Sequence, residues 1–221
     1  MDVQFDRALG AGRTSESFAQ RATRATLWYW GISLLFGIPL LWDWLGAWNV
    51  AATWANPWLV AYLIVTFAIG QGLYFLVARH DGRPFQLGPT VIFGIGNGIL
   101  ETLAFAVTYR VGEIIGSTLV GWFAPAWASG AGFALGVVLF VIYGGLIHGL
   151  FWLKILPPHL DDAPRSRQIR KFRPAAEIAL VLGWSICLWV TRDIWTVIFF
   201  HTLVDIGLML RVRPPLFQNP E

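Results

Sequence analysis

Two acidic residues and two histidines lie in stretches of this sequence that are otherwise apolar enough to cross a membrane. They are Glu101, His148, His201 and Asp205. A charge at the centre of a bilayer costs at least about 2.5–3.5 kcal/mol, so such side chains normally face the interior of a helix bundle and a partner. Carboxylates and imidazoles together transfer protons, bind metal ions or activate water. We therefore predict one polar site built from all four residues.

The spacing of these residues supports a common site. His201 and Asp205 are four residues apart, so a helix places both on one face, one turn from each other. Glycines precede Glu101 at positions 94, 96 and 98, and glycines flank His148 at positions 144, 145 and 149. Small residues allow helix backbones to approach closely, and we interpret both glycine groups as packing surfaces. Glu177, near the start of a predicted span, is assigned to the end of that span and not to the site.

The composition indicates a membrane protein that must position these residues with helices. Hydrophobic residues make up 56% of the chain and charged residues only 13%, whereas soluble domains average about 25% charged residues. Thirteen tryptophans are typical of a chain that meets membrane–water interfaces. The net charge of +3 comes from basic residues between apolar stretches, so we expect the lipid bilayer as a partner and no nucleic acid. The single Cys187 excludes an intramolecular disulfide.

The hydrophobic stretches predict six transmembrane helices. Each is close to the roughly 20 residues that a span requires, and they cover 25–45, 58–78, 89–109, 130–156, 175–191 and 193–211. Segment 111–129 is also apolar, and we predict that it stays on the outer face as an interfacial or re-entrant segment. This arrangement places fourteen of the sixteen Lys and Arg residues on the cytoplasmic side and only Arg110 and Arg192 outside. The expected fold is an all-α, polytopic membrane helix bundle.

The same pattern gives the expected organisation of the chain. Residues 1–24 form a cytoplasmic tail without a cleavable signal peptide, and 25–88 contain two accessory transmembrane helices. Residues 89–211 form the membrane core that carries the site, and 212–221 form a second cytoplasmic tail. We expect a multi-pass protein of a bacterial inner (plasma) membrane, with both termini on the cytoplasmic side.

The ordered set of ionisable residues resembles the CAAX-prenyl-protease and bacteriocin-processing (CPBP) family of intramembrane endopeptidases. That family has a Glu-Glu-x-x-x-Arg helix, then Phe-x-x-x-His, then His-x-x-x-Asn or Asp. In this chain Glu101 opens the first motif, His148 closes the second, and His201 and Asp205 form the third. The similarity covers about 89–211. Thr102, Ala106 and Gly144 stand where the family pattern has its second Glu, its Arg and its Phe.

The resemblance implies peptide-bond hydrolysis inside the membrane, on a membrane-embedded or membrane-anchored peptide substrate. It assigns Glu101 as general base to a water, with His148 sharing the activation. It assigns His201 and Asp205 to stabilising the oxyanion or orienting the site. A divalent metal such as zinc, bound by the same four residues, is a second way to activate the water; no H-E-x-x-H helix offers a preformed ligand pair.

Two other classes of function use the same residues. In a proton- or ion-coupled membrane protein the four residues would form a relay, extended across the bilayer by Gln71 and Asn97. In a non-catalytic CPBP-like assembly or immunity factor, the residues would serve helix packing. The Thr102 and Ala106 departures favour this last alternative.

Overall fold

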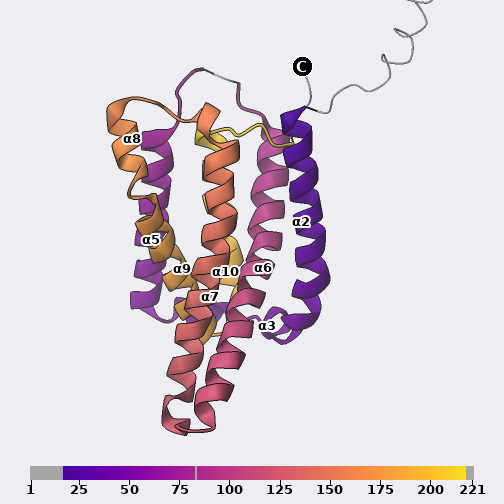
Figure 1. The fold of residues 1–221 in the computed structure, drawn as a ribbon, viewed down its shortest axis with the longest axis vertical. Coiled ribbons are helices and arrows are strands. Elements are labelled where there is room, and N and C mark those ends of the chain that lie inside the picture. Colours follow the sequence, from indigo (N-terminus) through magenta and orange to yellow (C-terminus); the bar gives the residue numbers. More distant parts are fainter. Residues whose placement is uncertain (1–16, 83, 218–221) are drawn as a thin grey trace, which may run out of the picture.

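The computed structural model describes residues 17–82 and 84–217, and within them the chain is a helix bundle without a β-strand. The all-α fold class is therefore confirmed. The elements in chain order are α2 (Phe18–Leu40), α3 (Trp42–Ala47), α4 (Val50–Trp54), α5 (Pro57–Val77), α6 (Leu87–Gly121), η1 (Pro125–Trp127), α7 (Ala128–Leu150), the π-helical turn η2 (Phe151–Ile155), η3 (Pro157–His159), α8 (Pro164–Arg170), α9 (Arg173–Val190) and α10 (Ile194–Arg211) (Figure 1).

Within the described residues, five helical segments are long and apolar enough to cross a membrane, as expected of a multi-pass membrane protein. They are Pro57–Val77, Leu87–Gly121, Pro125–Ile155, Pro164–Val190 and Ile194–Arg211. The prediction of six was wrong at the first stretch, 25–45. Helix α2 begins in a polar segment at Phe18 and ends at Leu40, so the predicted stretch runs across a break in the helix. Pro39 lies in the last turn of α2, and proline disfavours continuation of a helix.

The predicted interfacial or re-entrant segment 111–129 does not exist as a separate element. Helix α6 continues without interruption to Gly121, and α7 starts at Ala128, so the segment is the tip of one long helical hairpin. At 35 residues α6 is about 52 Å long, well beyond the roughly 30 Å of a hydrocarbon core. The hairpin extends past the other helices (Figure 1). Close packing holds its arms together: a Cβ added at Gly112 would lie 2.7 Å from the Leu135 carbonyl oxygen.

The two ends of the bundle differ in charge. One end holds the start of α2, the α5–α6 connection, residues 151–173 and the end of α10, and we call it the basic end (Figure 1). Eleven of the thirteen described Lys and Arg residues lie there; Arg7, Arg13 and Arg83 fall outside the described residues. The other, hairpin end holds α3, α4 and the α6–α7 tip. The segments predicted to share the cytoplasmic side therefore do share one end of the molecule.

Local sequence signals set the starts of several helices. Ser17 and Gln20 form a capping box at the start of α2, each side chain accepting from the backbone N–H of the other. Asn56 caps α5 by accepting from the Leu59 N–H, and Pro57 occupies its first position. Asp193 accepts from two N–H groups at the start of α10. These caps fix the residue at which each helix begins, and therefore the position of every residue of that helix along the bundle axis.

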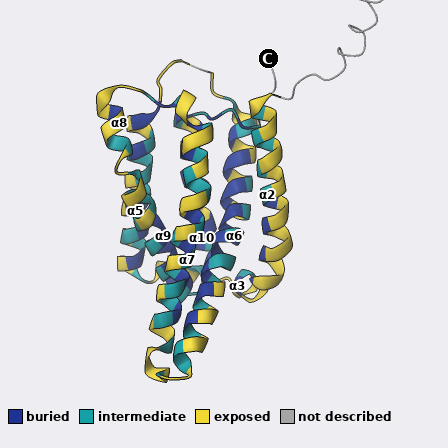
Figure 2. Cartoon of the chain, viewed as in Figure 1, coloured by how far each residue is buried: buried dark blue, intermediate teal, exposed yellow. Residues whose placement is uncertain are grey.

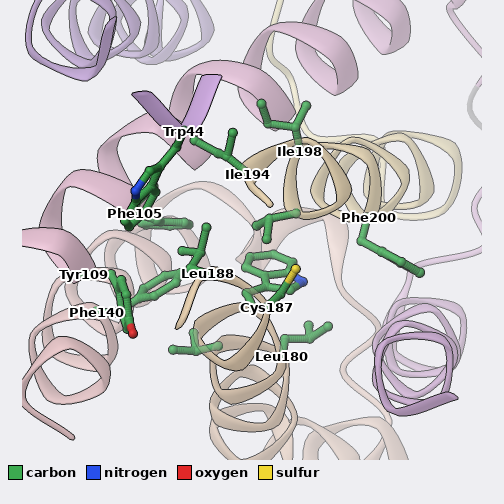
Figure 3. Packing of buried hydrophobic residues seen from close by; sticks show 14 of the residues in the cluster. Trp44, Phe105, Tyr109, Phe140, Leu180, Cys187, Leu188, Ile194, Ile198 and Phe200 are labelled. Carbon is green, nitrogen blue, oxygen red and sulfur yellow. The ribbon is translucent and has the colours of Figure 1, made fainter. Parts of the chain in front are cut away.

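The core lies between α6, α7, α9 and α10 near the middle of the bundle. Phe105, Tyr109, Phe140 and Leu188 are buried there, packed ring against ring or ring against aliphatic chain (Figure 3). Large apolar side chains also cover the outside: exposed faces run along α2, α5 and α7 (Figure 2), and exposed residues there include Trp28, Trp58 and Leu146. An apolar exterior around an apolar core is what a lipid solvent requires.

A charged group at the hairpin end, which we call the arginine cluster, consists of Asp43, Arg110, Glu113 and Arg192 around Trp44. Arg110 donates to Asp43, and Arg192 donates to Glu113. The guanidinium carbons of Arg110 and Arg192 lie 5.0 and 5.3 Å from the Trp44 ring centroid. Two permanent cations are thus matched by two carboxylates and one aromatic face. This cluster ties α3 to α6 and to the α9–α10 connection.

Candidate functional site

Close contact between α6 and α10 brings the first part of the site together. A Cβ added at Gly98 would lie 2.2 Å from Thr202 Oγ1, and one at Gly94 would lie 2.5 Å from Ile206 Cγ1. Only glycine permits this approach, as the sequence predicted. It places Glu101 of α6 beside His201 and Asp205 of α10. The same expectation was wrong for the glycines at 145 and 149 near His148, which have open space around them.

The four predicted residues meet in one cluster. His201 Nε2 lies 3.4 Å from Glu101 Oε2 and 3.4 Å from Asp205 Oδ2. His148 Nε2 approaches Glu101 Oε2 from α7 at 3.9 Å. Glu101, His201 and Asp205 are buried, whereas the His148 side chain is 27% exposed. Phe105 stacks on the His201 ring at 5.7 Å and meets the His148 ring edge to face at 5.6 Å, which holds both imidazoles in place.

Asn97 links the two carboxylates of the site. Its Nδ2 donates to Glu101 Oε2 at 2.6 Å and to Asp205 Oδ2 at 3.0 Å. Its Oδ1 accepts from the Trp30 indole N–H at 2.9 Å, so a residue of α2 fixes the orientation of the amide. The sequence placed Asn97 in a relay path and α2 among accessory helices. The indole of Trp30 instead connects α2 directly to the site.

Thr102 determines which nitrogen of His201 carries the proton. The Thr102 hydroxyl donates to the Gly98 carbonyl oxygen at 2.6 Å, so its single proton is used there. Towards His201 Nδ1, at 2.9 Å, Thr102 therefore accepts, and Nδ1 is the protonated nitrogen. The Nε2 lone pair of a neutral His201 then faces the carboxylate oxygens of Glu101 and Asp205. Such an arrangement is stable only with a cation, a proton or a metal ion, between them.

The spacing of the donor atoms suits a metal ion. One ligand atom each from Glu101, His148 and His201 lies within 4.8 Å of the others, so this group could hold an ion. Two ligands at 2.0–2.1 Å from a tetrahedral ion are about 3.4 Å apart, close to the 3.4 and 3.9 Å from Glu101 Oε2 to the two imidazoles. Three protein ligands with one open position is the pattern of catalytic zinc sites.

Glu177 belongs to this site, although the sequence assigned it to the end of a span. Its Oε1 lies 3.7 Å from His148 Nδ1, and its Oε2 lies 3.6 Å from Arg173 Nε. His148 thus stands between two carboxylates, Glu101 on one side and Glu177 on the other. A carboxylate behind an imidazole commonly fixes its tautomer and ring orientation. The sequence signal was present but weak, because only tertiary packing brings α9 against α7.

A cavity of about 100 Å³ opens beside the cluster and is lined by Glu101, His148, Asp205, Glu177 and Tyr29 among others. This volume holds a few water molecules but not a peptide. His201 is buried and does not line this cavity. The Tyr143 hydroxyl donates to the Tyr29 hydroxyl at 3.4 Å, and Tyr29 lines the cavity. Tyr29 therefore presents a hydroxyl group at the cavity wall, a contribution that the sequence did not reveal.

The polar site does not continue towards the hairpin end. The amide of Gln71 donates to the backbone carbonyls of Leu203 and Val204 at 3.4 and 3.5 Å, away from the cluster. Beyond Phe105 the core consists of the buried rings of Tyr109, Phe140 and Trp184. The polar residues of the site thus gather in one zone of the bundle, separate from the arginine cluster.

Comparisons with known proteins identify no relative of this chain. No family model, no curated protein and no solved structure matches it. Function must therefore be argued from the geometry of the site.

Proposed function

We propose that this chain is an intramembrane endopeptidase of the CPBP type that hydrolyses peptide bonds of membrane-embedded or membrane-anchored substrates. The observation that carries the proposal is the convergence of Glu101, His148, His201 and Asp205 in one cluster inside an apolar bundle. Three of them, Glu101, His148 and Asp205, line a water-sized cavity. Burying two carboxylates in such surroundings is costly, and a purely structural role would be met at lower cost by apolar side chains.

Glu101 is positioned to act as the general base. Its Oε2 is held by Asn97 and faces both imidazoles, whereas its Oε1 carries no hydrogen bond among the described residues. Oε1 is thus free to take a proton from a water in the cavity and to deliver it to the leaving amine. His148, held from behind by Glu177, orients that water from the exposed side of the cluster.

The protonation of His201 changes the role that the resemblance suggested for it. With its proton on Nδ1, neutral His201 directs its Nε2 lone pair towards Glu101 and Asp205 and cannot donate to an oxyanion. It suits a metal ligand better, and a divalent ion such as zinc, when bound by Glu101, His148 and His201, would supply Lewis-acid polarisation and a more acidic water. The Tyr29 hydroxyl is then the available donor to the developing oxyanion.

The relay alternative finds less support. A proton path across the bilayer requires polar groups on both sides of the cluster. Gln71 is bonded to backbone carbonyls, and beyond Phe105 the core is formed mainly by the aromatic rings of Tyr109, Phe140 and Trp184. The non-catalytic alternative makes a different prediction, which is that no peptide bond is cut.

The decisive experiment compares the protein termini of host membranes that contain wild-type protein, Glu101→Gln or Glu113→Gln. Glu113 serves as the matched control because it is a paired acid of the same helix in the arginine cluster. We expect a set of membrane-protein termini that are present with wild type and with Glu113→Gln and absent with Glu101→Gln. Identical termini in all three membranes, with equal protein levels, would overturn the endopeptidase proposal.

A further inference from the structure

A second pocket lies at the basic end, away from the polar site, where α5 and α10 both finish. It measures about 540 Å³, and its walls include Arg79, His80, Arg211 and Arg213 together with Phe75 and Leu210. Neither Glu101 nor any other residue of the site cluster lines it. The pocket therefore requires an explanation of its own.

The charge of this pocket favours an anion. Three arginines line it against one acid, Asp81, and Arg79 also lies 3.8 Å from Asp162 of the neighbouring loop. Arg213 donates from Nε to the Leu210 carbonyl, which offsets part of the negative end of α10. Arg211 packs its guanidinium over the Phe75 ring at 5.7 Å, and its buried Nε has no hydrogen-bond partner among the described residues. An excess of positive charge and an unused donor remain.

The height and the walls of the pocket distinguish a lipid from a soluble anion. The spans Pro57–Val77 and Ile194–Arg211 both end here, so the pocket lies where hydrocarbon gives way to headgroups. Phe75 and Leu210, which line the pocket together with the arginines, are 53% and 43% exposed. Arginines above an apolar, outward-facing wall match a molecule with a phosphate above acyl chains. A soluble phosphate compound has no apolar chain that could pack against that wall.

We propose that the pocket formed by the ends of α5 and α10 binds the phosphate headgroup of an anionic membrane lipid. Arg79 and Arg211 contact the phosphate, and the acyl chains lie along Phe75 and Leu210. The proposal does not depend on hydrolysis at Glu101, because the two pockets share no lining residue. Each basic residue near an anionic lipid surface contributes about a fivefold change in binding.

The test uses the purified full-length protein and phosphatidylglycerol as the probe. Lipid retention is measured by native mass spectrometry from mixed phosphatidylglycerol and phosphatidylcholine micelles, for wild type, Arg79→Gln, Arg211→Gln and the double variant. The matched control is Arg165→Gln with Lys171→Gln, two exposed basic residues of the same end that lie outside the pocket. We expect selective retention of phosphatidylglycerol, lowered about fivefold by each pocket variant and about 25-fold by both, with the control near wild type.

Several results would overturn the proposal. Equal losses in the control and pocket variants would show that general surface charge retains the lipid. In a competition experiment, inorganic phosphate could displace phosphatidylglycerol at the same concentration as a glycerophosphate-containing lipid does. That result would show that the pocket is a site for soluble anions instead. Thermal unfolding in neutral detergent checks that each variant is folded, and the exposed Arg79→Gln alone keeps the test valid if Arg211→Gln is unstable.

Discussion

Two clusters of ionisable side chains connect the helices of this protein, and they are built on opposite principles. The arginine cluster at the hairpin end matches two guanidinium groups with two carboxylates, so its charge is balanced at any ordinary pH. The site cluster contains two carboxylates and two imidazoles in mutual contact, with no Lys or Arg bonded directly to Glu101 among the described residues. Its charge depends on a proton or a metal ion.

This difference distinguishes a structural role, expected for the arginine cluster, from a chemical role, expected for the site cluster. In the arginine cluster each acid has a permanent partner, and the cations also pack on Trp44. In the site cluster the Nε2 lone pair of His201 and the Oε1 atom of Glu101 have no permanent protein partner and are available to a proton, a water molecule or a metal ion. Groups left in this way are expected where protons or ligands are exchanged. Replacing acids in the two clusters should therefore have opposite consequences.

The largest effect is expected from Glu101→Gln. Glutamine keeps the size and the hydrogen bond to Asn97 but takes no proton, so cleavage of a substrate identified by its termini should fall by about 10²–10⁴. Stability should remain near wild type, because a buried charge is removed. The initial cleavage rate and the thermal midpoint in detergent measure both quantities.

Two variants control this result. Glu113→Gln in the arginine cluster should leave the cleavage rate unchanged and lower the thermal midpoint, since it leaves Arg192 without its partner. Asp205→Asn should keep substantial activity, because asparagine has the same size and its side-chain oxygen still accepts from Asn97 Nδ2. Wild-type cleavage by Glu101→Gln would exclude it as the base. Loss of activity in Asp205→Asn equal to that in Glu101→Gln would show that the Asp205 carboxyl itself is required.

The next effect concerns Tyr29, the donor that α2 adds to the site. Tyr29→Phe should lower kcat by about 10² with KM little changed, because one oxyanion donor is lost and substrate binding is not. Tyr143→Phe is the matched control, since it removes the hydroxyl that donates to Tyr29 and leaves the Tyr29 proton in place. Equal losses of kcat in the two variants would argue against a direct role for Tyr29.

Removal of the carboxylate behind His148 should have a smaller effect, seen in metal affinity. Glu177→Gln should weaken zinc binding about 10- to 100-fold, because His148 loses the group that fixes its orientation. Calorimetric titration of the metal-free protein measures this, with Glu113→Gln as the control acid. Unchanged affinity would mean that Glu177 serves Arg173 alone.

The smallest effect is expected in the arginine cluster itself. The hydrogen bond from Arg110 lowers the pKa of the Asp43 carboxyl below its usual value. The carboxylate therefore adds stability at pH values above about 4, and this contribution disappears as the pH falls through the lowered pKa of the folded state. Asp43 is exposed, so Asp43→Asn should cost less than about 1 kcal/mol at pH 7.

The thermal midpoints of wild type and Asp43→Asn, measured between pH 7 and pH 2.5, test this expectation. The difference between them should be constant at the upper values and vanish at the lowest. A difference that does not change with pH would show that Asp43 acts through packing and not through its charge.

The sequence by itself determined the fold class and the four residues of the site cluster. Apolar stretches long enough to span a bilayer allow little except helices, because every backbone hydrogen bond must be made within the chain. Ionisable residues are so rare in such stretches that Glu101, His148, His201 and Asp205 were visible without any structure. Glycines at 94 and 98 also predicted close helix packing, and α6 and α10 are in close contact at both positions.

Only the tertiary structure decided what surrounds these residues and where the helices end. Segment 111–129 looked like a separate element because its length and its Gly and Pro suggested a break, but packing against α7 carries α6 on to Gly121. The contributions of Tyr29, Asn97 and Glu177 depend on which helices lie side by side. Contacts between residues distant in the chain leave no periodic signal in the sequence, because packing is set by the shapes of whole helices.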